Sequence, residues 1–185
     1  ADNVLTDAER RAGCVLVDLG AETTTVAVYC RNILRHLAVI PLGSDNITKD
    51  IETLQVEAKV AEQLKLKYGT AYTENPEEEN LKIRIDSNKL AEIVEARTEE
   101  IIENVWYQVP PEYNDKLLGG IILTGGGSNL KNIEQAFRRF THIDKIHTAK
   151  FVNLSINTNI PDLIPHDGTM NTILSILAKG DENCA

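Results

Sequence analysis

A short turn near the start of the chain contains residue types that could hold a phosphate group and a magnesium ion. Asp18 ends an apolar run, and Gly20, Thr23 and Thr24 follow it. In a tight turn of this composition, backbone N–H groups and threonine hydroxyls can point at phosphate oxygens, while the carboxylate holds Mg²⁺ through water. An ordinary hairpin turn would use the same residues, so this stretch alone leaves both interpretations open.

A second turn, about one hundred residues later, has three consecutive glycines. The apolar strand 121–124 leads into Gly125, Gly126 and Gly127, and Ser128 follows as a potential helix N-cap. Glycine has no Cβ, so a ligand can approach the backbone closely, and a helix start suits a phosphate or the edge of a nucleoside. One glycine run is weak evidence, because loops also use glycine for steric reasons alone, but two turns at matching strand ends are stronger evidence for a binding site.

Strand-rich segments surround both turns. The sequence predicts an antiparallel meander of three strands at 14–19, 24–30 and 33–42. Around the glycines it predicts a strand at 120–124, a helix at 128–140, a strand at 145–152 and a closing helix at 169–179. The two turns should therefore be positioned by one sheet.

The residues between these segments have helical periodicity. One helix should begin at Ser44, with Ser44 or Asp45 as its cap, and a second should end near Gly69. A long helix is predicted from 87 to 108, with Ile101 and Trp106 on its buried face. The remaining segments are an acidic, solvated loop at 70–80 and a short strand at 81–85.

Composition excludes several classes of protein. Nineteen Lys and Arg against 28 Asp and Glu give a net charge of −9, which repels nucleic acid. No apolar run approaches the roughly 20 residues that span a bilayer. Three cysteines without C-x-x-C spacing and four scattered histidines predict no disulfide framework or metal cluster, and fit a reducing cytoplasm. The first residues contain no initiator methionine or signal segment, which we interpret as a cut within a longer polypeptide.

Together with the sequence between them, the two turns resemble the FtsA family of bacterial cell-division proteins, which belong to the actin-like ATPase superfamily. The motif pair is Asp-x-Gly-x-x-Thr-Thr at 18–24 and an apolar strand before Gly-Gly-Gly at 125–127. The stretches that narrow the resemblance to this family are 4–6, 35–43, 46–51 and 61–69. The similarity covers nearly the whole chain.

The resemblance implies an α/β, actin-like fold. Residues 1–45 and 110–185 would form the RNase H-like subdomain IIA, and residues 46–109 an inserted subdomain IIB. The chain would correspond to the C-terminal half of the family's protein. The first phosphate loop and the C-terminal amphipathic membrane helix would then lie outside it.

The resemblance also implies ATP and Mg²⁺ as cofactors. Asp18 would hold Mg²⁺ through water. The cofactor-binding residues would be Gly20, Thr23 and Thr24 at the phosphates, Gly125, Gly126 and Gly127 at the adenosine, and Glu62 and Lys65 near the ribose and adenine. Glu and Lys three apart are also a common solvated surface pair, which leaves that alternative open.

Two residues depart from the family pattern. Glu22 stands where the family usually has glycine, and Thr25 where it often has Asp. Unit charges about 4 Å apart repel by roughly 4 kcal/mol at an intermediate dielectric, so Glu22 would oppose a triphosphate unless it points away. With half of the cleft, we expect ATP binding by this chain to be weak or absent.

The implied function is that of a cytoskeletal adaptor at the inner face of the cell membrane, which self-associates into filaments and tethers FtsZ filaments at the division site. The FtsZ C-terminal tail would bind the inserted subdomain, with Lys82, Arg84 and Arg97 as candidate basic contacts. No catalytic residue is predicted, and any ATP hydrolysis would be slow and regulatory. The alternatives are a pseudo-ATPase scaffold without nucleotide binding and a small-molecule kinase of the same superfamily.

Overall fold

A five-stranded sheet is the centre of the computed structural model, which describes residues 3–73, 86–149, 165 and 167–183. The strands lie in the order β3-β2-β1-β4-β5. Their bounds are β1 Cys14–Leu19, β2 Thr24–Cys30, β3 Ile33–Ile40, β4 Gly120–Thr124 and β5 Ile146–Thr148. β1, β2 and β3 pair antiparallel, whereas β4 is parallel to both β1 and β5. The predicted meander is confirmed.

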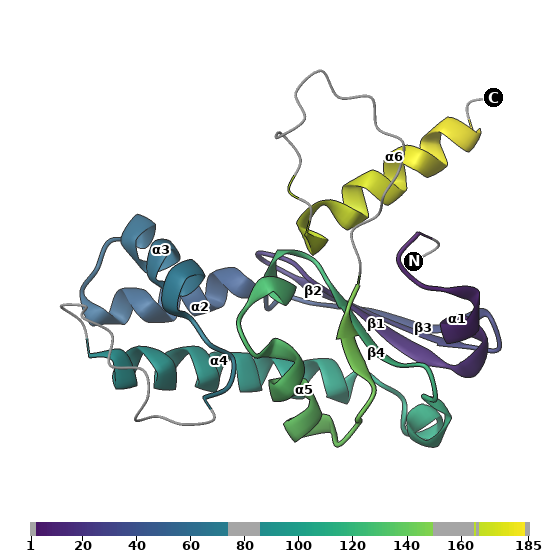
Figure 1. Cartoon of the computed structure of the whole chain (residues 1–185), viewed down its shortest axis with the longest axis horizontal. Helices are drawn as coiled ribbons and strands as arrows, with labels where there is room; N and C mark the ends of the chain where they lie inside the picture. Colours follow the sequence, from purple (N-terminus) through teal and green to yellow (C-terminus); the bar gives the residue numbers. More distant parts are fainter. Residues whose placement is uncertain (1–2, 74–85, 150–164, 166, 184–185) are drawn as a thin grey trace.

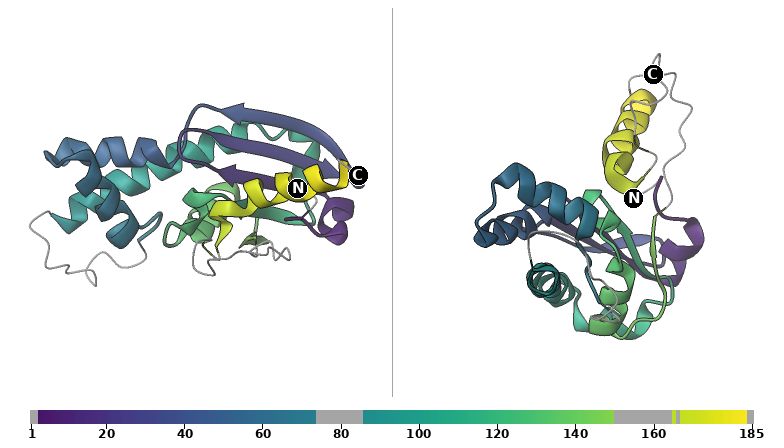
Figure 2. Two further views of the ribbon diagram at one scale, coloured as in Figure 1. Left: turned by 90° about the horizontal axis from the view of Figure 1, so that it is seen from above. Right: turned by 60° about the vertical axis from the view of Figure 1, so that its left-hand side comes forward.

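Helices lie on both sides of this sheet (Figure 1). The α-helices are α1 Asp7–Ala12, α2 Ser44–Ile51, α3 Ala58–Tyr68, α4 Ser87–Tyr107, α5 Ile133–Thr141 and α6 Asn171–Asn183. Short 3₁₀ helices occupy Glu52–Leu54, Pro111–Lys116, Gly126–Asn129 and Gly168–Met170. α5 and α6 lie on opposite sides of the sheet, as the right-hand view in Figure 2 shows. The central strand β1 therefore lies between these two helices in the layering of the chain.

Successive side chains of β1 belong to two different apolar clusters, one on each face of the sheet. Val15, Val17 and Leu19 belong to the main apolar core, which includes Phe137 of α5. Leu16 faces the other way, with apolar residues of the N-terminal segment, β2 and β4. Successive residues of a strand point to opposite faces, so Asp18 shares the side of Leu16 and α6.

The helices α2, α3 and α4, together called the helical lobe, extend beyond one end of the sheet (Figure 1). α4 packs against α2 in the lobe and against α5 below the sheet. Asp86 caps α4 through bonds from the N–H groups of its first turn. Ile101 is buried as predicted, and Trp106 is half-buried against the core. One apolar cluster thus runs from the sheet into the lobe.

Two predictions about helix starts are wrong. The expected single helix at 128–140 is a 3₁₀ turn followed by α5, because Asn132 takes the left-handed conformation, with φ 60°, and interrupts the helical path. The cap of α2 is Gly43, whose N–H donates to Asn46 Oδ1 at 3.0 Å, and neither Ser44 nor Asp45 fills that position. The predicted strand 81–85 and most of the loop 70–80 lie outside the described residues.

Candidate functional site

Both turns leave the sheet at the same level. Asp18 of β1 and Thr124 of β4 are register partners in the parallel pair, and each is followed by its turn. In open α/β sheets, ligands bind in the crevice outside the carboxyl ends of the parallel strands. The sequence-predicted turns therefore meet at the edge where a ligand site is expected.

The first turn is a hairpin that is attached to the start of α2. The Gly20 N–H donates to the Thr23 carbonyl at 3.0 Å, which closes the loop. The carbonyls of Gly20 and Ala21 accept from the N–H groups of Ser44 and Asp45, at 2.9 and 2.8 Å. This leaves the hairpin fixed to the helical lobe through backbone bonds.

The hydroxyl-bearing residues of this hairpin have different roles. Thr24 is fully buried, and its hydroxyl donates to the Leu42 carbonyl at 2.8 Å. Thr23 and Glu22 are exposed. The Thr24 hydroxyl is thus used by the protein itself, while Thr23 remains accessible to a ligand.

The glycines of the second turn also differ from one another. Gly125 has φ 85° and ψ 169°, and a Cβ there would lie 2.4 Å from Asp18 Oδ1 and 2.5 Å from the Leu19 carbonyl oxygen. A Cβ on Gly126 would meet only the Thr169 side chain, at 3.9 Å. Gly125 is therefore required for the close approach of the two turns, whereas packing does not require a glycine at 126.

A cavity of about 460 Å³ opens between the glycine turn and the helical lobe. Its volume is in the range of small-molecule and cofactor sites. Its polar and rim residues include Ser44, Asp45, Glu62, Lys65, Leu66, Gly126, Gly127, Asn129 and Thr169. Its apolar wall includes Ile101, Ile102, Leu130, Ile133 and Phe137. The cavity thus combines an apolar interior with a few polar groups at one side.

Glu62 and Lys65 lie together at this cavity. The Lys65 ammonium is 2.8 Å from Glu62 Oε2, and Lys65 is only 5% exposed. Burial on its own would raise the pKa of Glu62, but hydrogen bonds from Lys65 and Thr48 and the charge of Lys65 outweigh that effect and lower it. The alternative of a solvated surface pair is wrong, because one partner is buried.

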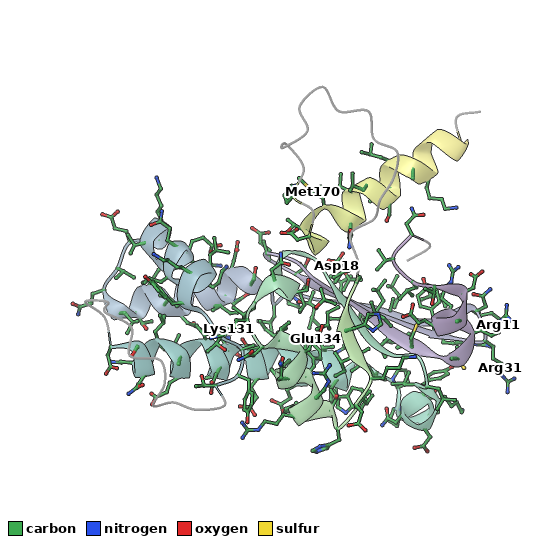
Figure 3. The ribbon with its side chains drawn as sticks, in the orientation of Figure 1. Arg11, Asp18, Arg31, Lys131, Glu134 and Met170 are labelled. Atoms are coloured by element: carbon green, nitrogen blue, oxygen red, sulfur yellow. The ribbon has the colours of Figure 1, made fainter. Side chains whose placement is uncertain are left out.

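Asp18 does not line this first cavity and lies on the other side of the sheet. Its Oδ2 accepts from the Thr172 hydroxyl of α6 at 2.6 Å. It lines a second cavity, of about 590 Å³, between the sheet and α6, with Thr25 and Thr124. Figure 3 shows Asp18 at the sheet edge, close to the start of α6. The structure brings Asp18 next to Gly125, but Asp18, Gly20, Thr23, Thr24 and Gly125 do not line the first cavity.

The candidate basic residues for a peptide partner are only partly described. Arg97 donates to both carboxylate oxygens of Asp50, at 2.5 and 3.1 Å, and also bonds Glu100. These contacts connect α4 to α2 and raise the pKa of Arg97, with the Asp50 hydrogen bond as the largest cause. Lys82 and Arg84 lie outside the described residues.

Sequence reasoning missed the loop that completes the cavity. Asp167 and Thr169 line it, with the Thr169 N–H donating to Asp167 Oδ1 at 2.8 Å and Asn129 donating to the Thr169 hydroxyl at 3.2 Å. The signal was an Asp-Gly-Thr sequence just before the closing helix, typical of a capped helix start. Thr48, which bonds both Glu62 and Lys65, gave no signal at all.

The described residues contain neither a metal-binding cluster nor a membrane-spanning helix. Among those residues, no cluster of three or more His, Cys, Asp or Glu side chains is arranged to hold a metal ion. Within the same part of the chain, no helix has the length and apolar character needed to cross a membrane.

Comparison with known sequences gives a consistent family. A family model described as "Cell division protein FtsA" matches residues 15–171. The chain is 30% identical to the FtsA protein of Buchnera aphidicola subsp. Baizongia pistaciae over 208 residues, which cover 97% of this chain and 47% of that protein. It is 32% identical to FtsA of Pseudomonas aeruginosa, covering 77% and 37%, and 35% identical to FtsA of Bacillus subtilis, covering 68% and 31%. The chain thus spans less than half the length of these relatives.

Comparison with solved structures gives the fold. MreB5 of Spiroplasma citri bound to AMPPNP matches with a TM-score of 0.69 at 17% identity, over 97% of this chain and 58% of that one. The archaeal actin homolog Ta0583 matches with a TM-score of 0.62 at 17% identity, over 94% and 50%. At these identities the likeness shows an actin-like α/β fold, as the sequence predicts.

Proposed function

Because the chain belongs to the FtsA family of cell-division proteins and has an actin-like fold, we propose that the cavity between the glycine turn and α3 is one half of an adenine nucleotide site. The observation that carries this proposal is Gly126. Its backbone faces the cavity, and a Cβ there would have ordinary contacts only. A glycine that packing does not require is explained by a ligand that approaches the backbone closely.

The residues around Gly126 fit a nucleoside. Glu62 Oε2 accepts from Lys65 and Thr48, whereas no described residue donates to its Oε1, which is free to accept from a ribose hydroxyl. Leu66 lines the cavity and is 75% exposed, and Leu130 lines it too. A purine base between such side chains would remove apolar surface from water. The sugar and the base thus both have matching groups.

The phosphates would lie toward the hairpin. The exposed Thr23 hydroxyl and the backbone N–H groups at Glu22 and Thr23 belong to a segment that β1, β2 and α2 hold in place. Asp18 retains lone pairs beyond its bond from Thr172, which suits a water ligand of Mg²⁺. When bound, Mg²⁺ would neutralise phosphate charge. Glu22 is exposed and does not line the cavity.

Nucleotide titration in the presence of Mg²⁺ tests the site. We expect ATP at millimolar concentration to shift the backbone NMR signals of Gly126, Gly127 and Glu62, with weak affinity because the chain supplies one side of a cleft. Gly126→Val should abolish these shifts without unfolding the chain, since its side chain would enter the cavity. Gly180→Val on α6, where a Cβ has no neighbour within 4 Å, is the matched control. ATP shifts that persist in Gly126→Val would place the site elsewhere.

For the whole protein, we propose an actin-like adaptor that self-associates into filaments and tethers FtsZ filaments to the inner face of the cell membrane. The family membership supports the role in cell division. Two fold neighbours support nucleotide binding and self-association separately: MreB5 was solved with AMPPNP, and MamK as a double helical filament, with a TM-score of 0.53 at 19% identity. ATP hydrolysis, if present, would be slow and regulatory.

The FtsZ tail would bind residues 46–109, which we propose as subdomain IIB, with residues 1–45 and 110–185 as subdomain IIA. A short peptide needs only a groove and a few anchors, and such a site does not depend on a second half of the nucleotide cleft. We expect a peptide from the FtsZ C-terminus to bind at tens of micromolar or weaker, about the strength of small transient interfaces. Absence of NMR shifts in the lobe at millimolar peptide would contradict this role.

Arg97 allows a controlled test of that contact. Arg97→Glu should weaken the peptide if the acidic tail docks at this guanidinium. The same change also breaks the pair with Asp50, so Asp50→Asn is the matched control that breaks the pair and keeps the positive charge. Equal losses in both variants would assign the effect to lobe structure and remove Arg97 from the peptide site.

A further inference from the structure

Three protein oxygens surround the Lys65 ammonium. It lies 3.1 Å from the Ser44 carbonyl oxygen, 2.8 Å from Thr48 Oγ1 and 2.8 Å from Glu62 Oε2. An ammonium group has three N–H donors and no acceptor. Lys65 therefore hydrogen-bonds two oxygens of α2 and forms an ion pair with Glu62 of α3, so it joins the two helices.

Thr48 is the centre of this group. It is 9% exposed, and its hydroxyl donates to Glu62 Oε2 at 2.5 Å while accepting from Lys65. Glu62 Oε2 thus receives two bonds, which fix its side chain and leave Oε1 as the oxygen that no described residue bonds. A buried ammonium without partners would be costly, so the position of each of the three side chains depends on the other two.

The hydrogen-bonded path continues from Lys65 to the hairpin. The residue whose carbonyl accepts from Lys65, Ser44, donates its own N–H to the Gly20 carbonyl. Asp45 donates to Ala21 in the same way. The contact is close, because a Cβ on Gly43 would lie 2.3 Å from the Ala21 carbonyl oxygen. The first turn of α2 therefore connects α3 to the hairpin.

From this geometry we propose that Thr48 and Lys65 are positioning residues that tie α3 to the first turn of α2 and so hold the hairpin Gly20–Thr23 in place for the phosphates. The identity of the ligand in this inference, an adenine nucleotide, rests on the proposed function. In this arrangement Glu62 Oε1 is the oxygen on α3 that can accept a hydrogen bond from the ligand.

Amide hydrogen exchange without nucleotide tests the positioning role directly. We expect Thr48→Val, which keeps the shape of the side chain but removes its hydroxyl, to speed exchange of the Ser44 and Asp45 amides about tenfold or more. Thr48→Ser should restore wild-type exchange, and the amides of β1 should be unaffected in both variants. Thr53→Val is the control, since Thr53 lies in the same lobe and its hydroxyl donates only to the Asp50 carbonyl.

Lys65→Met should have the same effect on the Ser44 and Asp45 amides as Thr48→Val, and the threonine pair decides the question if Lys65→Met fails to fold. Unchanged exchange at Ser44 and Asp45 in Thr48→Val would overturn the proposal. So would equal acceleration across the whole sheet, because that pattern reports loss of global stability.

The second measurement is ATP affinity by NMR titration. Thr48→Val should weaken binding about tenfold and Thr48→Ser should bind within about twofold of wild type, because only the hydroxyl completes the path. Wild-type ATP affinity in Thr48→Val would overturn the positioning role. If the wild-type chain shows no adenine nucleotide binding, the proposed function fails, and the exchange experiment alone decides whether Thr48 and Lys65 hold the hairpin.

Discussion

Replacing Gly125 by alanine should destabilise the chain, while the same change at Gly126 should not. Gly125 has φ 85° and ψ 169°, a region that is essentially restricted to glycine and costs other residues about 1–3 kcal/mol. The new Cβ would also lie 2.4 Å from Asp18 Oδ1 and 2.5 Å from the Leu19 carbonyl oxygen, and such overpacking costs about 1–3 kcal/mol. The two contributions give a loss of roughly 2–6 kcal/mol.

Urea and thermal unfolding measure this difference. For a chain of this size the loss at Gly125 corresponds to a fall in Tm of roughly 5–20 °C. Gly126→Ala should stay within about 0.5 kcal/mol of wild type, since its Cβ has ordinary contacts only. Equal destabilisation of both variants would refute the reasoning, because it would mean that general backbone freedom, rather than the approach to Asp18, explains the glycines.

Three further predictions follow from contacts elsewhere in the chain. Because the pKa of Glu62 is lowered in the folded chain, its carboxylate stabilises the fold above the unfolded pKa of 4.5, and this stabilisation is lost as the pH falls through the lower folded pKa. Glu62→Gln should remove this part of the pH dependence of the free energy of urea unfolding. Burial raises the pKa of Cys14 to about 12, so iodoacetamide at about pH 8 should leave Cys14 unmodified until the chain unfolds, as peptide mapping by mass spectrometry would show. Asp50→Asn should lower the free energy of unfolding by about 1 kcal/mol, a modest loss because solvent screens the partly exposed pair with Arg97.

The sequence predicted the elements that rest on local patterns. The alternation and turn residues of 14–42 were sufficient for the meander, and Pro110 marked the end of the long helix. The break between the 3₁₀ turn and α5 could not be predicted from local patterns. It occurs at Asn132, which is left-handed and whose side-chain amide donates to the Tyr72 carbonyl and the Thr70 hydroxyl. Both partners are far away in the sequence. The division into two subdomains stays a prediction.

The candidate site was predictable only in part, for a related reason. Gly125 and Gly126 are adjacent glycines that a local pattern cannot tell apart, yet Gly125 lies against Asp18 and Gly126 faces a cavity. Glu62 and Lys65 have the spacing of an exposed pair, and only the packing of α3 against α2 buries the lysine. Thr48 joins them from a position 17 residues before Lys65. Such relations are set by tertiary packing, which a local pattern does not contain.

The pairing of Asp18 with Thr124 limits the kinds of genetic change that this part of the gene can accept. A codon deletion within 15–17 would shift the rest of β1 by one residue and turn Asp18 toward the side of Val17 and Phe137, placing a carboxylate in the apolar core. Exchanging one aliphatic residue for another in the same strand leaves that alternation intact. We therefore expect natural variants of this chain to vary in residue type along 15–17 but not in length.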